Sequence, residues 1–420
     1  MSLLSHKCTY SSKIELKSKY CIDLVLQPLT SHVILKINGS LTSEDIIRTV
    51  VSLAVDKNSV HSVSKKYSDV ACETSLRYHL KKLNMEELIL SNENILLQNP
   101  LKMLKAGKGY EFAVDLTNDP YYGKTDLSNE KYVIRSQAKK STNSFYSYIS
   151  LYITNKNERF TVSVLPVEKD KTMVEYLSYF IDLINKLNFK IKVLCLDREF
   201  YSIDVFEFLQ NNSVPHIVPV VKKGEKMKQI LKGNKARSAQ YVMKNSMKKI
   251  LLDIIIDVKY LKGKRDKKGC ENLGFVVFGV KWSPRKVSTV YRRRFAIESS
   301  YRMRNVVKPK TSSKNTTIRY FYALISFLLK NIWLYLQKKH FTIVKRGPQV
   351  IDEDKFRFEV FVLLIEEWLR RKLRVRTVVG CLRSKLRWRT PLQATGYVRA
   401  TALNFVKVDN NPKQFSLSKN

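Results

Sequence analysis

Three carboxylates stand in three separate local contexts of the sequence. Asp115 and Asp197 each end a short apolar run, and Glu298 lies in a basic stretch of helical character. Two aspartates at strand ends and one helical glutamate can converge on one point of a folded chain. Carboxylate oxygens are the ligands that hard divalent cations prefer, and a pair of such ions roughly 3.5–4 Å apart can act on a phosphodiester. We therefore expect these three acids to bind divalent cations and to carry the chemistry.

The charge of the chain indicates what kind of substrate would reach these acids. Lys and Arg number 76 against 37 Asp and Glu, which gives a formal net charge of +39. Each Lys or Arg placed near a phosphate releases a counterion, so an excess of this size favours a polyanionic partner over a small molecule. Nucleic acid is the first expectation. A ribosomal or chromatin-type binder is the plainer alternative, and an anionic membrane surface is less favoured still.

Size and cysteine usage limit the class of protein further. With 420 residues, of which 44% are hydrophobic, the chain is long enough for about two to four domains with cores of their own. The six cysteines form no C-x-x-C pair and no histidine set accompanies them, so we expect neither a structural zinc site nor disulfides. The N-terminus has no long apolar run of the kind found in signal peptides. The most apolar stretch, 320–336, is interrupted by polar residues and predicts a buried helix, not a membrane span.

The first 105 residues are expected to form a mostly helical DNA-binding region. Ser43, Glu44 and Asp45 form a helix-start signal before an apolar run. Residues 60–83 have the size and charge of a helix-turn-helix, in which the second helix enters the major groove. Four side chains would then face the DNA: Ser75, Arg77, Tyr78 and Lys81. A small helical hairpin without a DNA role has much the same sequence pattern, and this alternative stays open.

From residue 110 onward, the spacing of hydrophobic residues changes to the mixture of strand and helix patterns that is typical of an α/β domain. The expected elements are strands at 110–116, 144–154 and 159–166, a helix at 173–189, a strand at 191–196, a helix that Ser202 caps, and a strand at 216–221. The order βββαβαβ is that of an RNase H-like domain, whose first and fourth strands are neighbours at its centre. Asp115 and Asp197 are therefore expected side by side.

A mostly β insertion is expected to divide this core. Residues 106–221 are the first part of the core, and residues 287–340, with the glutamate helix, are the second. Between them, residues 222–286 show the alternation of β-strands. The charged loop 262–268 is interpreted either as a solvated hairpin tip or as a phosphate contact. Residues 341–420 are expected to form a basic, helical C-terminal region.

The stretch around Glu298 resembles a known family. Tyr291-x-x-Arg294-x-x-x-Glu298 matches the Y-x-x-R-x-x-x-E pattern of insertion-sequence DDE transposases of the cut-and-paste type with a β insertion. Two further segments are similar to the aspartate segments of an archaeal branch of these elements: Val114–Asp115 followed by Asp119–Gly123, and Leu196–Tyr201. The three matches occur in order, with a β-rich insertion before the glutamate, and together cover about residues 110–336.

The resemblance implies a role for each residue of the Tyr-Arg-Glu pattern. Helical spacing of three and four residues would place Tyr291, Arg294 and Glu298 on one face. Glu298 would complete the metal site, Arg294 would fork onto a DNA phosphate, and Tyr291 would hydrogen-bond another phosphate. As a plainer alternative, Arg294 forms an exposed ion pair and Tyr291 is a partly buried aromatic.

This chain departs from the family pattern at one position. The pattern continues to a lysine seven residues after the glutamate, where this sequence has Asn305. Arg304 precedes that position and Lys308 follows it, and either side chain is expected to take over the phosphate contact. Which of the two does so stays open.

The function implied by the resemblance is that of a DDE transposase. Two Mg²⁺ ions, for which Mn²⁺ can substitute, would support cleavage of double-stranded DNA at the terminal inverted repeats of an insertion element and strand transfer into target DNA. A homodimer would pair the element ends, in the prokaryotic cytoplasm at the nucleoid. Two alternatives stay open: an RNase H-like DNA nuclease without strand transfer, and a DNA-binding transposase relic without catalysis. The intact set of three acids argues against the relic.

Overall fold

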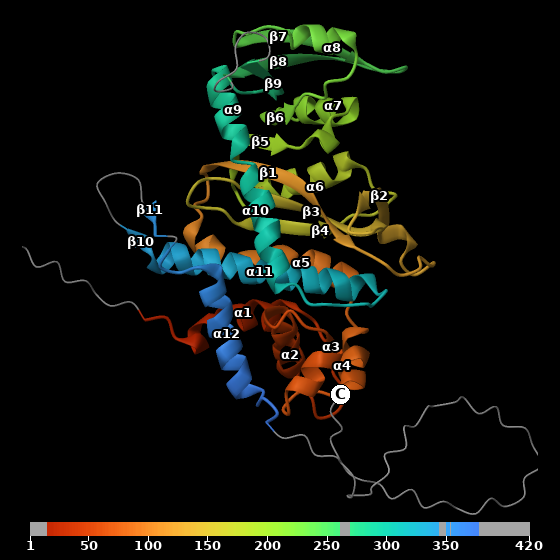
Figure 1. Ribbon diagram of the computed structural model, residues 1–420, viewed down its shortest axis with the longest axis vertical. Coiled ribbons are helices and arrows are strands. Elements are labelled where there is room, and N and C mark those ends of the chain that lie inside the picture. Colours follow the sequence, from red (N-terminus) through yellow and green to blue (C-terminus); the bar gives the residue numbers. More distant parts are fainter. Residues whose placement is uncertain (1–14, 261–268, 344–349, 353, 378–420) are drawn as a thin grey trace, which may run out of the picture. The chain divides into compact units, whose positions relative to one another are not determined.

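A nine-stranded mixed sheet runs through the computed structural model, which describes residues 15–260, 269–343, 350–352 and 354–377. The strand order is β2-β3-β1-β5-β6-β9-β8-β7, and β4 pairs with β3 (Figure 1). The strands are β1 (Gly109–Pro120), β2 (Val133–Lys139), β3 (Thr142–Ile153), β4 (Thr161–Pro166), β5 (Lys190–Leu196), β6 (His216–Pro219), β7 (Arg237–Lys244), β8 (Lys249–Tyr260) and β9 (Cys270–Phe278). All of them belong to the compact unit formed by residues 1–376.

The centre of the sheet has the RNase H-like order that the sequence predicts. β1 pairs antiparallel with β3 and parallel with β5, and β5 pairs parallel with β6. Val114 of β1 lies opposite Leu196 of β5, and these are the residues just before Asp115 and Asp197. The expectation that the first and fourth predicted strands are neighbours is therefore confirmed. It brings Asp115, which lies inside the longer strand β1, next to Asp197, which follows the end of β5.

One strand of the core, β2, has no counterpart among the predicted strands. It forms a hairpin with β3 through the turn residues Lys140 and Ser141, both of which have positive φ. Its first residue, Val133, is buried, but the five residues from Arg135 onward are exposed. A strand without an apolar face lacks the alternation by which strands are recognised in a sequence.

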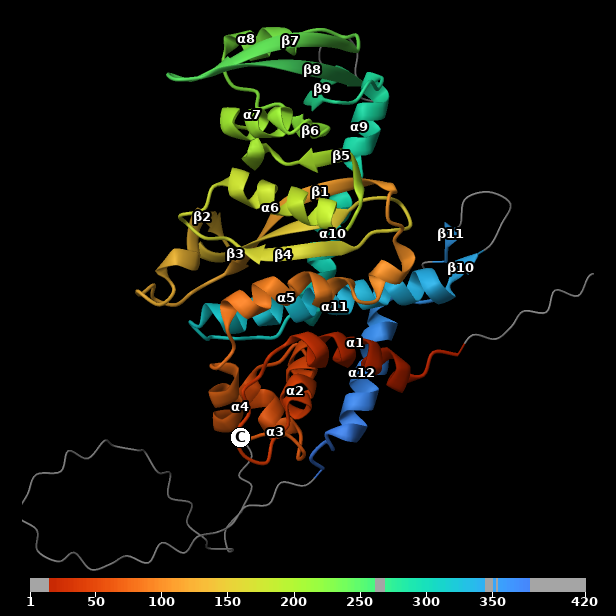
Figure 2. The ribbon, with the colours of Figure 1, turned by 180° about the vertical axis from the view of Figure 1, so that it is seen from behind.

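Helices cover both faces of the sheet. Those nearest the three acids are α6 (Met173–Lys186), α7 (Ile203–Asn211), α9 (Pro284–Arg292) and α10 (Phe295–Arg304). α6 and α7 lie on one face, and α9 and α10 lie on the other (Figures 1 and 2). The start of α6 is fixed by a capping box, in which Thr172 and Glu175 each accept a hydrogen bond from the backbone N–H of the other.

The insertion extends the core sheet and does not form a sheet of its own. After α8 (Glu225–Ile230), the strands β7, β8 and β9 form an antiparallel meander, and β9 pairs antiparallel with β6. Phe275 of β9 lies opposite Pro219 of β6, for example. The alternation in the sequence thus predicts these strands correctly. The loop 262–268 lies outside the described residues.

A helical part of the molecule combines the N-terminal helices with two helices from the other end of the described chain. Its helices are α1 (Ser18–His32), α2 (Ser43–Val55), α3 (Val60–Lys66), α4 (Glu73–Leu80), α5 (Met85–Leu97), α11 (Thr316–His340) and α12 (Phe358–Lys372). α12 packs on α1 and α2, whereas α11 packs on α5. Tyr67, after α3, forms a β-bridge with Val375, after α12. The helices α1 and α2 are therefore packed against a helix, α12, that follows the predicted core segments in sequence.

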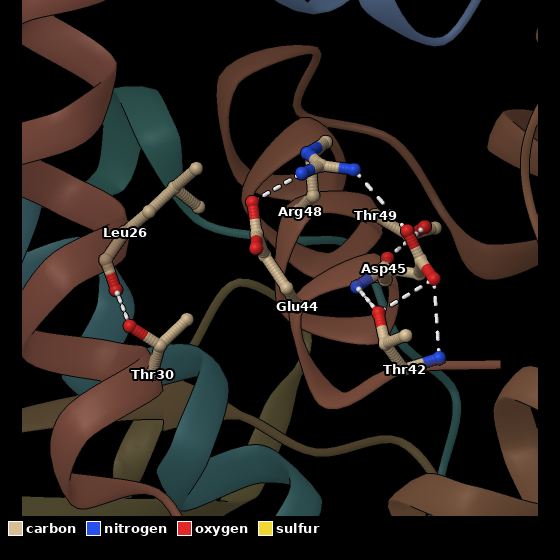
Figure 3. A network of polar contacts seen from close by, with 7 residues as sticks. All are labelled: Leu26, Thr30, Thr42, Glu44, Asp45, Arg48 and Thr49. Carbon is tan, nitrogen blue, oxygen red and sulfur yellow. Dashed lines mark hydrogen bonds and ion pairs between the residues drawn. The ribbon is translucent and has the colours of Figure 1, made fainter.

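The start of α2 shows how the sequence fixes a helix in this bundle (Figure 3). Thr42 is the N-cap, and its hydroxyl accepts a hydrogen bond from the backbone N–H of Asp45 at 3.2 Å. The Asp45 carboxylate accepts from the backbone N–H of Thr42 at 3.1 Å, which completes a capping box. Arg48, one turn later, pairs with both Glu44 and Asp45. The predicted helix start at 43–45 is confirmed.

The remaining elements are short. They are the 3₁₀ helices at Pro100–Met103, Glu130–Tyr132, Arg198–Phe200 and Asn305–Val307, and the paired strands β10 (Thr342–Ile343) and β11 (Val350–Ile351). The expected basic C-terminal region is described only as far as residue 377, and residues 378–420 lie outside the described part. Within the described residues, no helix is long and apolar enough to cross a membrane, and the apolar stretch 320–336 lies inside the mostly buried α11.

Candidate active site

The three acids singled out in the sequence surround one side chain, Arg294. Its Nη1 lies 3.2 Å from Oδ2 of Asp115, and its Nη2 lies 3.0 Å from Oε1 of Glu298. Asp197 is more distant, with 3.9 Å between its Oδ1 and the same Nη2. Asp115 lies on β1, Asp197 directly follows β5 and Glu298 lies on α10. Three separate elements thus contribute to one acidic cluster, defined here as Asp115, Asp197 and Glu298.

The acids of this cluster differ in their exposure to solvent. The side chain of Asp115 is 11% exposed, against 37% for Asp197 and 45% for Glu298. The pKa of Asp115 is raised to about 7, mainly by burial; the charge of Arg294 opposes this shift, and the charges of Asp197 and Glu298 add to it. The cluster therefore has one buried, weakly acidic member and two members at the surface.

Arg294 is buried among these acids and does not face solvent. Only 4% of the residue is exposed, and among its nitrogens Nε and Nη1 have no hydrogen-bond partner of good geometry. Its guanidinium also lies over the rings of Tyr291 and Phe295, at 5.5 and 5.2 Å from their centres. The expectation that Arg294 presents a fork to a DNA phosphate does not hold in this conformation, because the acids attract the guanidinium inward.

The expectation of one continuous helix through the Tyr-Arg-Glu pattern is also wrong. α9 ends at Arg292 and α10 begins at Phe295, with a tight turn at Arg293 and Arg294. Within the turn, hydrogen bonds join residues three apart, such as the N–H of Arg294 and the carbonyl of Tyr291. A helical spacing of three and four residues is compatible with such a turn, so the sequence pattern did not reveal the break.

Tyr291 contacts the backbone beside Asp197, where the sequence analysis expected it to contact DNA. Its hydroxyl donates a hydrogen bond to the carbonyl of Leu196 at 3.2 Å, and the residue is 7% exposed. Its ring packs against Phe275 of β9, with ring centres 5.0 Å apart. The hydrogen-bonding group predicted for a phosphate is therefore already bonded within the protein.

Arg304 and Lys308, the two candidates for the family's missing lysine, both bind Asp119. Arg304 is fully buried, and its Nη2 lies 2.7 and 2.6 Å from the two oxygens of Asp119. Lys308 places its Nζ 2.9 Å from Asp119 Oδ1. None of the surface of Arg304 is exposed, so its position in this structure gives no support to the expected DNA contact. Asn305, between them, is exposed.

Three acids form a row on β1 that was not predicted as a unit from the sequence. Glu111, Asp115 and Asp119 are spaced by four residues, so all three point to the same face of the strand. Glu111 is 1% exposed and accepts hydrogen bonds from Arg293 at 2.8 and 3.0 Å. Each acid of the row thus pairs with an arginine of the α9–α10 segment. The spacing E-x-x-x-D-x-x-x-D on a predicted strand was the available signal.

A cavity of about 310 Å³ lies next to the acidic cluster, between β9 and α9. Its lining includes Arg198, the residue after Asp197, together with Phe275 and Tyr291. Lys222 and Arg292 add positive charge to the lining. The cavity thus combines aromatic faces with cationic groups.

The predicted DNA-reading residues lie on or next to α4. Arg77, Tyr78 and Lys81 are exposed and Ser75 is half-buried. Arg77 pairs with Glu73 one turn earlier, at 2.7 Å. α3 and α4 are thus the two short helices that the sequence predicts, and three of the four predicted side chains are accessible.

Part of the chain matches a known family model. Residues 107–306 match the family model of the transposase DDE domain, and this segment contains all three acids. No curated protein matches the chain. Among solved structures, the chain is similar to that of the piggyBac transposase synaptic complex with hairpin DNA, with 12% identity, a TM-score of 0.49, and 86% of this chain and 83% of that chain covered. The segment 107–306 is therefore similar to a transposase DDE domain.

Proposed function

We propose that this protein is a DDE transposase, which uses Mg²⁺ to cleave double-stranded DNA at the ends of an insertion element and to transfer the cleaved strands to target DNA. The observation that carries the proposal is the convergence of Asp115, Asp197 and Glu298 on one buried cationic group, beside the end of β5. A site that gathers three carboxylates around a positive charge suits divalent cations in the chemistry of its donors. When bound, a pair of such ions would activate a water or a DNA 3′-hydroxyl and stabilise the leaving oxygen.

The fit of the cluster to metal ions depends on Arg294. Among the described residues, no three acidic, histidine or cysteine side chains lie close enough together to hold a metal ion. The guanidinium lies between the acids, so it competes with any cation that they would share. Its planar fork matches the geometry of a phosphate. Arg294 would therefore exchange its acids for a backbone phosphate when DNA arrives, and this exchange would make the acids available.

Other parts of the chain would hold the DNA. The α3–α4 pair would read the terminal inverted repeats through Arg77, Tyr78 and Lys81, with Ser75 at the edge of the contact. The cavity beside the acidic cluster suits a nucleotide, since its aromatic rings can stack on a base while Arg198 and Lys222 face a phosphate. Residues 1–105 would thus recognise DNA, and the core 106–221 with 287–340 would cut it. A homodimer would pair the two element ends.

The test is an assay on a duplex that carries the inverted repeats found beside the gene. The full-length protein should cleave this duplex in Mg²⁺ and yield joined products with a target plasmid. Replacing Asp115, Asp197 or Glu298 by Ala should abolish cleavage and leave duplex binding largely intact, because most DNA affinity comes from phosphate contacts elsewhere. Asp204→Ala is the control, since Asp204 is an exposed acid on α7. Cleavage without joined products would support the nuclease alternative, and binding without cleavage would support the relic.

A further inference from the structure

Tyr301 connects the helix of Glu298 to the backbone of Asp115. It follows Glu298 by three residues on α10, so the two side chains lie on neighbouring positions of the helix surface. The Tyr301 hydroxyl donates a hydrogen bond to the backbone carbonyl of Asp115 at 2.9 Å. The residue is buried, and its ring packs edge-on against Phe327 of α11. One hydrogen bond thus joins two elements that each supply an acid of the cluster.

Ser150 adds a second link to the same hydroxyl. Its Oγ lies 2.8 Å from the Tyr301 oxygen, and Ser150 is the residue of β3 that pairs with Asp115 in the sheet register. A tyrosine hydroxyl has one proton, which goes to the Asp115 carbonyl, so Ser150 is the donor in this second bond. Both residues are buried, which shields the bonds from water. The chain from Ser150 through Tyr301 to Asp115 fixes the helix against two strands at the position of the acid.

We propose that Tyr301 is a positioning residue, whose hydroxyl sets the distance between Glu298 and Asp115 and thereby the affinity of the acidic cluster for divalent cations. The inference rests on the proposed function, since it assigns the geometry of the same acids. Groups that bind a metal must be held to within about 0.5 Å of their productive positions. Glu298 is on a helix and Asp115 on a strand, so their separation depends on how the helix is attached. Replacing a residue that orients a metal ligand, without binding the metal itself, commonly changes metal affinity by about 10–100-fold.

A tyrosine that only stabilises the fold is the plain alternative, and Tyr320 provides a matched control. Tyr320 lies on α11, is fully buried, and donates its hydroxyl proton to the carbonyl of Val164 on β4 at 2.7 Å. It therefore makes the same kind of helix-to-strand hydrogen bond as Tyr301. None of the three acids is among its hydrogen-bond partners. Phenylalanine at either position removes one buried hydroxyl and leaves the ring in place.

The experiment measures Mn²⁺ binding to the full-length protein without DNA, by the loss of the free-ion signal in electron paramagnetic resonance. Tyr301→Phe should weaken Mn²⁺ affinity by about tenfold or more, whereas Tyr320→Phe should leave it at the wild-type value. Both variants should lose similar thermal stability. In the cleavage assay, Tyr301→Phe should require more Mg²⁺ for half-maximal rate, recover in excess Mg²⁺, and bind the duplex as the wild type does.

Equal Mn²⁺ affinity of the two phenylalanine variants would overturn the inference and leave the proposed function standing. Absence of Mn²⁺ binding and of cleavage in the wild type would overturn the proposed function itself. If Tyr301→Phe does not fold, Ser150→Ala tests the same chain of bonds, because it removes only the outer donor. A smaller loss of Mn²⁺ affinity in Ser150→Ala would support the inference, and an unchanged affinity would count against it.

Discussion

Arg304 and Asp119 form a buried ion pair that joins the end of α10 to the end of β1. One guanidinium nitrogen, Nη2, lies within 2.7 Å of both carboxylate oxygens. Burial alone would raise the pKa of Asp119, but the charges of Arg304 and Lys308 hold it below its ordinary value. At the other end of the segment, Arg293 binds Glu111. The helix that carries Glu298 is therefore tied to the Asp115 strand on both sides of the acidic cluster.

This relationship predicts that Arg304 contributes to stability and not to DNA binding. Arg304→Ala leaves Asp119 buried without its main partner, which should cost about 3–5 kcal/mol of unfolding free energy. The slope of log affinity for duplex against log salt concentration should equal that of the wild type, because a residue with no exposed surface cannot replace a counterion on DNA. Chemical denaturation measures the free energy of unfolding. Binding titrations at several salt concentrations measure the salt dependence of duplex affinity. Arg302→Ala, at an exposed neighbouring position, is the control for stability. A stable Arg304→Ala protein with a reduced salt slope would contradict this assignment.

A second prediction concerns the competition between Arg294 and metal ions. Arg294→Ala removes the positive charge that lies between the acids, so Mn²⁺ affinity of the DNA-free protein should increase, on the order of tenfold. Cleavage should nevertheless fall, because the proposed phosphate contact is lost. Arg294→Lys should recover only part of the cleavage, since an ammonium lacks the planar fork.

Arg293→Ala is the matched control for this prediction. Arg293 is the other residue of the turn between α9 and α10, and it binds Glu111 instead of the acidic cluster. Its replacement should leave Mn²⁺ affinity unchanged, apart from any loss through reduced stability. An unchanged or lower Mn²⁺ affinity in Arg294→Ala would mean that the guanidinium helps to arrange the acids and does not compete with a cation.

Apart from β2 and the break between α9 and α10, the order of strands and helices in the core could be predicted from the sequence, because the hydrophobic residues of strands and helices recur at different spacings. The pairing of Val114 with Leu196, and with it the approach of Asp115 to Asp197, follows from that order. The partners of Tyr291 and Arg304 could not be predicted in the same way. Helical spacing tells which residues share a face, but not which strand covers the face. An exposed DNA contact and a buried ion pair therefore have the same sequence pattern.

The packing of α12 on α1 and α2 was also beyond the sequence pattern, and it changes how DNA recognition should be tested. A fragment that ends near residue 97 would lose α11 and α12 and expose apolar surface on α1 and α5. Single replacements in the full chain are the sounder test. Arg77→Ala should reduce discrimination between terminal-repeat and random duplex by about 1–3 kcal/mol, if Arg77 contacts a base edge.

Arg371→Ala is the control for recognition by α4. Arg371 lies on α12 and pairs with Glu367 one turn earlier, as Arg77 does with Glu73, so both variants break the same kind of exposed ion pair. Competition binding with labelled repeat and unlabelled random duplex gives the discrimination directly. Equal effects of the two replacements would remove α4 as the reading helix and leave the cavity beside the acidic cluster as a candidate.

The last prediction is a loss of stability in mild acid that arises from His216. Burial lowers the pKa of His216 to about 4, although its hydrogen bond to the carbonyl of Val214 opposes the shift. The ring lies between Phe206 and Phe278, and its Nε2 is buried without a hydrogen-bond partner. A proton added at Nε2 would therefore have no acceptor. In the unfolded chain the pKa is near 6.5, so between pH 6.5 and pH 4 the unfolded state binds more protons than the folded state.

The free energy of unfolding should consequently be highest above pH 6.5 and should fall progressively toward pH 4. Protonation of His216 should account for about 3 kcal/mol of this fall. Denaturation curves between pH 7.5 and pH 4.5 measure how the free energy of unfolding changes with pH. His216→Phe should be less stable at pH 7.5, because it loses the bond to Val214, but its stability should fall less steeply with acid. His61→Gln, at an exposed position, should keep the wild-type slope. The same slope in His216→Phe and the wild type would show that the acid sensitivity has another source, since the buried imidazole is the only group that this replacement removes.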